Sequence, residues 1–247
     1  MLLAIDVGNT STKLALFDGD SLVKRSTFPT DRTTSAELLK TQIKSETDGS
    51  ITDAIACSVV PEIDEALGAA IRDAFGIDLR LVKTSDDFGL NFLGAVDHAG
   101  TDRLVNSFAA AGLYGTPVIL ISFGTATVIE AIDGDRRHLG GLIAPGMRTS
   151  AKALELATSK LPEIEIAKPS SVVGYDTVDA IRSGIFYSQV GLVEHVVEQL
   201  KNKIGADAKV IATGGFASMI AEECECIDIV NKDLTVNGLR MLYSRGT

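Results

Sequence analysis

The sequence contains only three cysteines, Cys57, Cys224 and Cys226, and three cysteines do not make a disulfide framework. We therefore expect a protein of the reducing cytoplasm. No run of about 18 apolar residues occurs, which argues against a membrane-spanning helix and against the membrane as a partner. No positively charged segment precedes the first apolar stretch, so a secretory signal is not expected.

Positive charge is also scarce. The chain has 23 Lys and Arg against 33 Asp and Glu, a net charge of −10. Nucleic acids and anionic lipids require a basic surface, so neither is an expected partner. An anionic small molecule remains compatible with this charge, because backbone N–H groups and one or two lysines can hold phosphate.

Two common phosphate-binding signatures are missing, GxxxxGK[ST] and GxGxxG. Their absence argues against the nucleotide-binding folds that depend on those loops. The sequence instead alternates apolar strand-like and amphipathic helix-like segments, which is typical of an α/β protein. Its 247 residues suffice for one large domain or two of about 120 residues.

An internal repeat is the most informative feature. Residues 2–20 read LLAIDVGNTSTKLALFDGD, and residues 118–135 read VILISFGTATVIEAIDGD. Each copy has an apolar strand, a turn of small residues, a second apolar strand and Asp-Gly-Asp. Asp6 at the mouth of the first turn is matched by Ser122 in the second. The repeat predicts two similar α/β halves, residues 1–115 and 116–247.

The first turn carries groups that suit phosphate and Mg²⁺. Asp6 can hold a hydrated Mg²⁺, because this hard ion prefers carboxylate oxygens and keeps several waters. Gly8 lets the backbone approach a phosphate, and Lys13 adds positive charge. The alternative is a plain hairpin with a polar turn. The repeat argues against it, because two such turns facing each other across a cleft would clamp the phosphates of one nucleotide.

A third segment fits the same purpose. Residues 212–215, ATGG, follow an expected strand and open an expected helix, and Gly214 and Gly215 would let a flat ring lie against the backbone. Together with the two turns this segment predicts an adenosine site. The set of three resembles the ATP site of the sugar kinase, Hsp70 and actin ATPase superfamily, although the chain is too short for the inserted subdomains of those proteins.

A narrower resemblance, to type III pantothenate kinase, covers essentially the whole chain. It rests on motifs that occur in the same order in that family: DVGNT (6–10) with Lys13, GTDR (100–103) with Asn106, FGTA (123–126), GGLIAPG (140–146), TVDA (177–180) and ATGG (212–215). The resemblance implies a duplicated actin-like, ribonuclease H-like ATPase fold, with two similar α/β halves around a nucleotide cleft. It also implies ATP-dependent phosphorylation of pantothenate to 4′-phosphopantothenate, the first step of coenzyme A biosynthesis. The family acts as a homodimer with Mg²⁺ and a monovalent cation, K⁺ or NH₄⁺.

The resemblance also implies roles for individual residues. Asp102 would be the general base, and it can accept the proton of the substrate hydroxyl. The ATP-binding residues would be Asp6, Val7, Gly8, Asn9, Thr10, Ser11, Thr12, Lys13, Thr125, Gly214 and Gly215. The pantothenate-binding residues would be Gly100, Thr101, Asp102, Arg103 and Thr177. The planar cation of Arg103 suits a carboxylate, although Asp102 could instead serve only to cap a helix.

Three positions depart from the family pattern. Ser122 stands where the family has an Asp that ligates the monovalent cation, and Glu130 stands where it has another Asp. The family also places a substrate-contacting aromatic residue near Leu93, where the nearest aromatic residue is Phe92. Three explanations stay open: a kinase with altered cation dependence, a kinase whose cation is held by backbone and Glu130, or a relative that binds ligands as a regulator. Another phosphotransferase or phosphatase of the superfamily is a further alternative.

Other reactive side chains have simpler interpretations. Cys224 and Cys226 cannot close a tetrahedral metal site by themselves, so we expect core or surface thiols. His98, His138 and His195 are scattered along the chain. His195 lies in a long expected helix, residues 177–203, among apolar residues, so a packed or interface histidine is the expectation. That helix suits a dimer interface.

Overall fold

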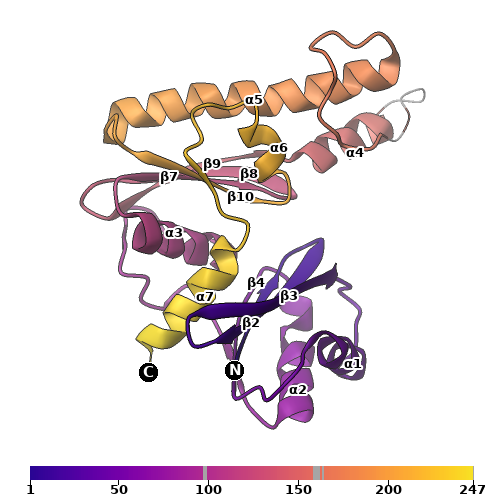
Figure 1. Cartoon of the computed structure of the whole chain (residues 1–247), viewed down its shortest axis with the longest axis vertical. Helices are drawn as coiled ribbons and strands as arrows, with labels where there is room; N and C mark the ends of the chain where they lie inside the picture. The colour runs from indigo at the N-terminus through magenta and orange to yellow at the C-terminus, as the bar shows by residue number, and fades with distance from the viewer. Residues whose placement is uncertain (97–98, 158–161, 163, 247) are drawn as a thin grey trace. The chain divides into compact units, whose positions relative to one another are not determined.

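The computed structural model describes residues 1–96, 99–157, 162 and 164–246, so His98 lies outside the described residues. The chain forms two compact units (Figure 1). Unit 1 comprises Met1–Gly89, Ala95–Ala109 and Asp233–Thr247, and unit 2 comprises Leu90–Gly94 and Ala110–Lys232. Each unit is built on one mixed sheet, which confirms the α/β class. The C-terminal helix belongs to unit 1, whereas the division by sequence assigned it to the second half.

The sheet of unit 1 has the strand order β3-β2-β1-β4-β5. Its strands are β1 (Leu2–Val7), β2 (Ser11–Asp18), β3 (Ser21–Pro29), β4 (Asp53–Ser58) and β5 (Leu79–Leu81). The first three strands form an antiparallel meander, and β4 and β5 continue the sheet in parallel with β1. Nearly every residue of β1 and β4 is buried, as expected for central strands that are covered on both faces.

Helices cover the sheet of unit 1. They are α1 (Ala36–Glu46), the short 3-10 helix η1 (Pro61–Ile63), α2 (Asp64–Phe75), the first part of α3 (Thr101–Tyr114) and α7 (Leu234–Arg245). Ile43 of α1 and Ile71 of α2 share one apolar core with Leu3 and Ile5 of β1. The α7 helix packs against β1 and β4. A Cβ on Gly238 of α7 would lie 2.7 Å from a methyl carbon of Val105 in α3, so this contact requires glycine.

Unit 2 repeats this topology. Its strands are β6 (Asn91–Phe92), β7 (Val118–Phe123), β8 (Ala126–Ile132), β9 (Arg137–Pro145), β10 (Lys209–Gly214) and β11 (Ile229–Val230), in the order β11-β10-β7-β8-β9-β6. Strands β7, β8 and β9 form the antiparallel meander, and β10 and β11 continue in parallel with β7. This is the arrangement of β1 to β5, so the duplication inferred from the sequence repeat is confirmed. Strand β6 is added beside β9.

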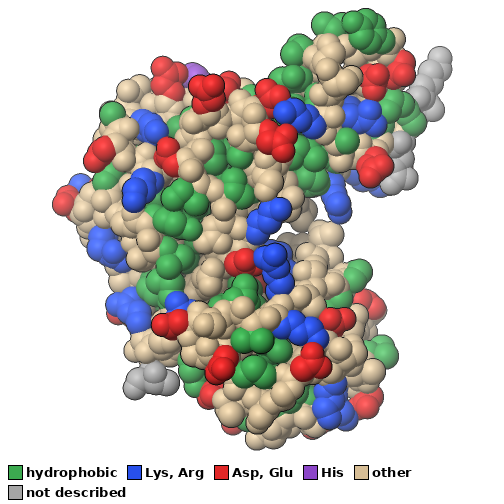
Figure 2. All heavy atoms as spheres, in the orientation of Figure 1, with side chains coloured by type: hydrophobic (Ala, Val, Ile, Leu, Met, Phe, Trp, Pro, Cys, Tyr) green, Lys and Arg blue, Asp and Glu red, His purple; other side chains and the backbone are tan. Residues whose placement is uncertain are grey.

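The long helix α5 (Thr177–Ile204) covers the sheet of unit 2, with α4 (Met147–Ala157) and the short α6 (Ala217–Ala221). Phe186 and Val193 of α5 are buried in one core with Ile121 and Ile129 of the sheet. On the outside, acidic and basic side chains are interspersed over the face drawn in Figure 2. Among the described residues, no helix combines the length and apolar character needed to cross a bilayer.

The first turn of α5 is capped by Asp176, whose carboxylate accepts a hydrogen bond from the backbone N–H of Asp179 at 2.8 Å. Asp176→Ala removes this acceptor, and losing an N-cap costs about 1 kcal/mol of stability. We expect the Tm to fall by about 2–4 °C, because a protein of this size loses that much per kcal/mol. Asp176→Asn keeps an acceptor oxygen and should melt close to wild type in the same calorimetric series. Equal melting of wild type and Asp176→Ala would contradict the role of the cap.

Candidate functional site

The first turn of unit 1 is tight, and Asn9 and Thr10 at its tip are exposed. Asp6 on β1 is paired with Lys13 on β2, and Val7 is paired with Thr12, so Gly8, Asn9 and Thr10 make the turn. The N–H of Gly8 donates to the carbonyl of Ser11 at 3.1 Å. A Cβ on Gly8 would also lie 3.1 Å from that oxygen, so the turn closes most easily on glycine.

Asp6 and Lys13 form an ion pair across the two strands. Lys13 Nζ donates to Asp6 Oδ2 at 2.9 Å, and the side chains are 40% and 8% exposed for Lys13 and Asp6 respectively. Burial by itself would lower the pKa of Lys13, but the charge of Asp6 and its hydrogen bond outweigh that effect and the pKa is raised. Lys13 therefore carries its positive charge at neutral pH, beside the open turn.

Cys57 approaches Asp6 from the other side. It lies on β4, directly opposite Asp6 in the parallel pairing with β1, and it is 0% exposed. Its Sγ donates to Asp6 Oδ1 over 3.7 Å. Burial, followed by the charge of Asp6, raises the pKa of Cys57 well above its usual value, so the group is a neutral thiol. Cys57 could not be assigned to this site from the sequence, because the pairing of β1 with β4 carries no local sequence signal.

The start of α3 is fixed at the end of β4, next to Cys57. The hydroxyl of Thr101 donates to the carbonyl of Ser58 at 3.0 Å and accepts from its N–H at 3.2 Å. Asp102 Oδ1 accepts from the N–H of Arg103 at 2.8 Å. A Cβ on Gly100 would lie 2.5 Å from the same Oδ1, so a larger residue there would make this carboxylate turn away.

The structure thus gathers several residues singled out in the sequence. Asp102 is close enough to act electrostatically on both Lys13 and Cys57, and it raises the pKa of each, although less than Asp6 does. Asp6, Lys13 and Asp102 therefore form one charged cluster in unit 1, at the ends of β1 and β4. Two carboxylates and one ammonium group are the elements needed to hold a metal-bound phosphate and to accept a proton.

Arg32 is a second cation at the first turn, and it was not predicted from the sequence. Its Nη2 donates to Asn9 Oδ1 at 2.7 Å, and its Nη1 lies 3.4 Å from a carboxylate oxygen of Glu62. The preceding Thr30 secures the chain there, because its N–H donates to the carbonyl of Thr10 at 3.1 Å. Arg32 follows β3, far from the turn in sequence, and only the folded meander brings it there.

The second turn, in unit 2, is held by the glycine-rich segment that follows it. The N–H of Gly124 donates to the carbonyl of Ala126 at 3.0 Å. The carbonyl of Thr125 accepts from the N–H of Gly146 at 3.0 Å and from the hydroxyl of Thr149 at 2.6 Å. The end of β9 and the first turn of α4 therefore fix the shape of this turn.

The segment predicted to hold adenosine lies directly beside the second turn. Gly214 on β10 is paired with Phe123 on β7, and Thr213 is paired with Ser122. Gly214 has a φ of +96°, and a Cβ there would lie 2.3 Å from the Phe123 carbonyl oxygen. This close approach therefore requires glycine. Thr125, Gly214 and Gly215 thus lie at the neighbouring ends of β7 and β10, near Ser122.

Glu130, another departure from the family pattern, lies in a small cluster with His138 and Phe92. Glu130 is 2% exposed, and its Oε1 lies 3.3 Å from Nε2 of the buried His138. The ring of Phe92 packs on His138 with 5.0 Å between the ring centroids. Phe92 is therefore occupied in this cluster, whereas Leu93 is 61% exposed. His138, which the sequence analysis left unassigned, is the partner of Glu130.

Thr177, the third histidine and two of the cysteines lie in the sequence after the segments that form these clusters. Thr177 is the exposed first residue of α5. His195 is exposed on α5, so it does not pack inside the chain, and the alternative of an interface histidine stays a prediction. Cys224 is buried, Cys226 is half-buried, and both are free thiols, as expected. The described residues contain no group of three or more His, Cys, Asp or Glu side chains arranged to hold a metal ion.

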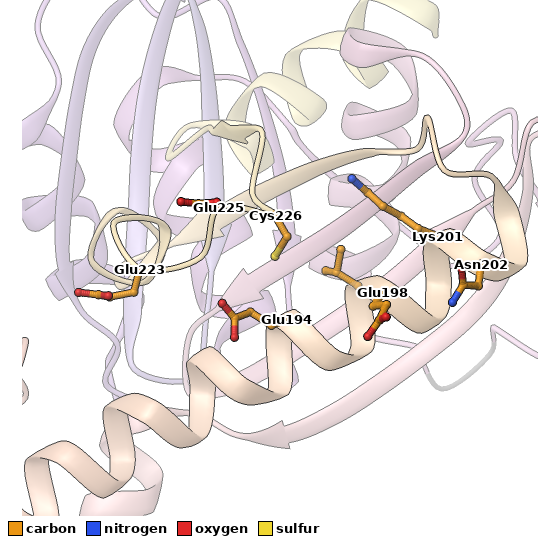
Figure 3. A pocket seen from close by; sticks show the side chains of 8 residues that line it. Glu194, Glu198, Lys201, Asn202, Glu223, Glu225 and Cys226 are labelled. Atoms are coloured by element: carbon orange, nitrogen blue, oxygen red, sulfur yellow. The ribbon is translucent and has the colours of Figure 1, made fainter. Parts of the chain in front are cut away.

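Unit 2 also has a cavity of about 620 Å³ between the second half of α5 and the segment after α6 (Figure 3). It is lined by Glu194, Val197, Glu198, Lys201, Asn202, Glu223, Glu225 and Cys226. None of the predicted site residues lines it. Four glutamate side chains against one lysine would repel the phosphates of a nucleotide, so the cavity does not suit ATP.

Comparisons with known proteins give a consistent result. The family model of type III pantothenate kinase matches residues 2–199. The type III pantothenate kinase of Agathobacter rectalis is 39% identical to this chain over 253 residues, covering 99% of the chain and 97% of the relative. That of Bacillus cytotoxicus is 41% identical over 252 residues, covering 99% and 96%.

Two solved structures have a similar fold. The ethanolamine utilization protein EutJ from Carboxydothermus hydrogenoformans gives a TM-score of 0.57 at 15% identity, covering 97% of this chain and 89% of that one. Component A of the (R)-2-hydroxyglutaryl-CoA dehydratase of Acidaminococcus fermentans gives 0.54 at 17% identity, covering 98% and 96%. At these identities the similarity shows the fold alone, which is that of the actin-like ATPases.

The three cysteines should differ in reactivity. Interaction with Cys224 lowers the pKa of Cys226, whereas burial raises the pKa of Cys57. We expect a thiol reagent at pH 8 to modify Cys226 rapidly and to reach Cys57 and Cys224 only on unfolding. Peptide mapping of the folded protein checks this, with Cys226→Ser as the control that should lack the rapid phase. Rapid labelling of Cys57 would show that the core around Asp6 is open.

Proposed function

The chain belongs to the type III pantothenate kinase family, and we propose on that premise that Asp102 is the base that activates pantothenate for phosphorylation by ATP. The product of this transfer is 4′-phosphopantothenate. The observation that carries the proposal is the clustering of Asp6, Lys13 and Asp102 at one end of β1 and β4. Phosphoryl transfer requires mainly positioning and neutralisation of charge, and this cluster has the groups for both.

The first turn would hold the phosphates of ATP. Lys13 supplies a fixed positive charge, and the backbone from Gly8 to Thr12 lies beside it. Mg²⁺ typically takes one or two carboxylates and completes its shell with water and phosphate oxygens, and Asp6 fits that requirement. When bound, the ion would neutralise charge on the phosphates. We assign Asp6 to the ion through water.

Asp102 and its neighbours would hold pantothenate. The Asp102 carboxylate can accept the proton of the substrate hydroxyl as the bond to phosphorus forms. Gly100 leaves the space that this carboxylate occupies. The hydroxyl of Thr101 ties the start of α3 to Ser58 of β4. Arg103 would pair with the pantothenate carboxylate, because its planar cation can bind both oxygens. Thr177, at the start of α5, is proposed as a further contact.

The second turn and the Gly214–Gly215 segment would hold the rest of the nucleotide. Thr125 is exposed on a turn whose shape is fixed by Gly146 and Thr149. Gly214 and Gly215 lie at the end of β10 next to that turn. A Cβ on Gly215 would meet no atom within 4 Å, whereas the same space at Gly214 is taken by the backbone of Phe123. A flat base can therefore lie against Gly215, and Gly214 brings the end of β10 close to the second turn.

A homodimer is also proposed. Support comes from apolar side chains that unit 2 leaves exposed on α4 and on the segment before α5: Leu154, Leu156, Val172, Val173 and Tyr175, of which Tyr175 is 90% exposed. Figure 2 shows hydrophobic side chains gathered over the segment before α5. Gathered apolar side chains of this kind mark protein contacts.

A reducing cytoplasm is proposed as the site of action, and the three free cysteines support it.

Ser122 is the observation that favours a second candidate. A relative that binds nucleotide and pantothenate without turnover, as a regulator, would tolerate the loss of a cation ligand. The intact cluster around Asp102 argues for the kinase instead, because a protein that only binds has no need of a base. The following experiments separate the two.

Asp102→Asn should reduce kcat for pantothenate phosphorylation by at least about 100-fold, since a general base contributes roughly that much or more. The asparagine keeps the size of the side chain but cannot take the proton. Asp73→Asn, on the exposed face of α2, is the matched control and should leave the rate unchanged. A coupled assay of ADP release measures both variants. Undiminished turnover by Asp102→Asn would contradict the assignment of the base.

Ser122→Asp should introduce a response to monovalent cations. The serine keeps an oxygen but lacks the charge, so we expect the wild-type rate to differ little between K⁺, NH₄⁺ and Na⁺ buffers. Restoring the carboxylate should raise the rate several-fold in K⁺ or NH₄⁺ over Na⁺. Ser122→Asn introduces a side chain of the size of aspartate but without its charge, so this variant should behave as wild type. An equal response to K⁺ in wild type and Ser122→Asp would place the cation elsewhere.

A further inference from the structure

Cys57 lies within the charged cluster of unit 1 but has no part in the scheme above. Three side chains follow one another across neighbouring strands at this point: Lys13 on β2, Asp6 on β1 and Cys57 on β4. Residues paired directly across strands project from the same face of a sheet. Asp6 is therefore flanked by Lys13 on one side and by Cys57 on the other.

The two neighbours use different oxygens of the carboxylate. Lys13 Nζ donates to Oδ2 at 2.9 Å, and Cys57 Sγ donates to Oδ1 over 3.7 Å. An aspartate carboxylate rotates broadly about its last side-chain bond unless both ends are held. Because Lys13 and Cys57 donate from opposite sides, they fix the plane of the Asp6 carboxylate. A carboxylate has about four acceptor positions, so two donors leave others open to a ligand.

We propose that Cys57 is a positioning residue, whose S–H group donates to Oδ1 of Asp6 and fixes the carboxylate in the orientation that receives the ion-bound phosphates of ATP. This inference rests on the proposed kinase function. It assigns no chemical step to the thiol, which acts only through Asp6.

The local geometry suits sulfur better than oxygen. A separation of 3.7 Å is within reach of a thiol donor but too long for a hydroxyl, which donates over about 2.5–3.0 Å. Cysteine also behaves as a small apolar residue in a core, and Cys57 is fully buried between Ala56 and Ser58 in the central strand β4. A thiol therefore supplies a donor at a position where the sheet admits a small apolar side chain.

The hydrogen bond can be observed without any assay of activity. The Raman S–H stretching band of Cys57 is isolated by subtracting the spectrum of Cys57→Ala from that of the wild-type protein. We expect it at lower frequency than an unbonded thiol, and we expect Asp6→Ala to move it upwards. Asp6→Asn, which keeps the shape with a weaker acceptor, serves if Asp6→Ala does not fold. A band that is the same in wild type and in the folded Asp6 variant overturns the proposal.

Kinetics then separate donation from packing. Cys57→Ala removes the donor and leaves a small void, whereas Cys57→Val removes the donor and refills the space. We expect both to raise the KM for ATP by about fivefold or more, as the loss of a hydrogen bond to a charged group implies, with the KM for pantothenate little changed. Wild-type KM values in Cys57→Val would make Cys57 a packing residue and overturn the proposal. A wild-type protein without kinase activity would contradict the proposed function, and the Raman shift would still decide whether Cys57 holds Asp6.

Discussion

The buried carboxylate of Asp6 is the feature on which unit 1 depends. An ionised carboxylate is costly to bury unless charged and hydrogen-bonding partners surround it. Here β2 supplies Lys13 and β4 supplies Cys57, one on each side of β1. This arrangement requires the strand order β2-β1-β4, and the tie between Thr101 and Ser58 then places Asp102 at the same end of the sheet. The reactive groups therefore meet because one charge has to be compensated.

Much of the fold could be predicted from the sequence, because its signals are local. Each repeat carries its own strands and turn, so the duplicated meander and the Asp6–Lys13 hairpin follow from adjacent residues. Cys57 and Arg32 could not be assigned in this way. Cys57 reaches Asp6 through a parallel pairing between strands far apart in the chain, and Arg32 reaches Asn9 across the meander. Neither contact leaves a periodic pattern in the sequence.

One departure from the family pattern, Glu130, has a structural partner in unit 2. Glu130, one methylene longer than the family's Asp, lies against His138, and Phe92 packs on the same imidazole. The Glu130 carboxylate and the Phe92 ring thus meet the same imidazole at the β8–β9–β6 side of the sheet. This cluster argues against Glu130 as a cation ligand, because His138 already lies next to its carboxylate. Ser122 lies on another strand, β7, and its replacement of Asp has no counterpart in the cluster.

In the proposed reaction, Asp102 receives the proton of the pantothenate hydroxyl while Lys13 faces the transferred phosphate. A crystal structure of Asp102→Asn with Mg²⁺, a non-hydrolysable ATP analogue and pantothenate tests it most directly. We expect the hydroxyl oxygen within about 3 Å of the side chain of residue 102, and Lys13 Nζ in contact with a phosphate oxygen. A hydroxyl beyond hydrogen-bond reach of residue 102, facing another carboxylate, would contradict it.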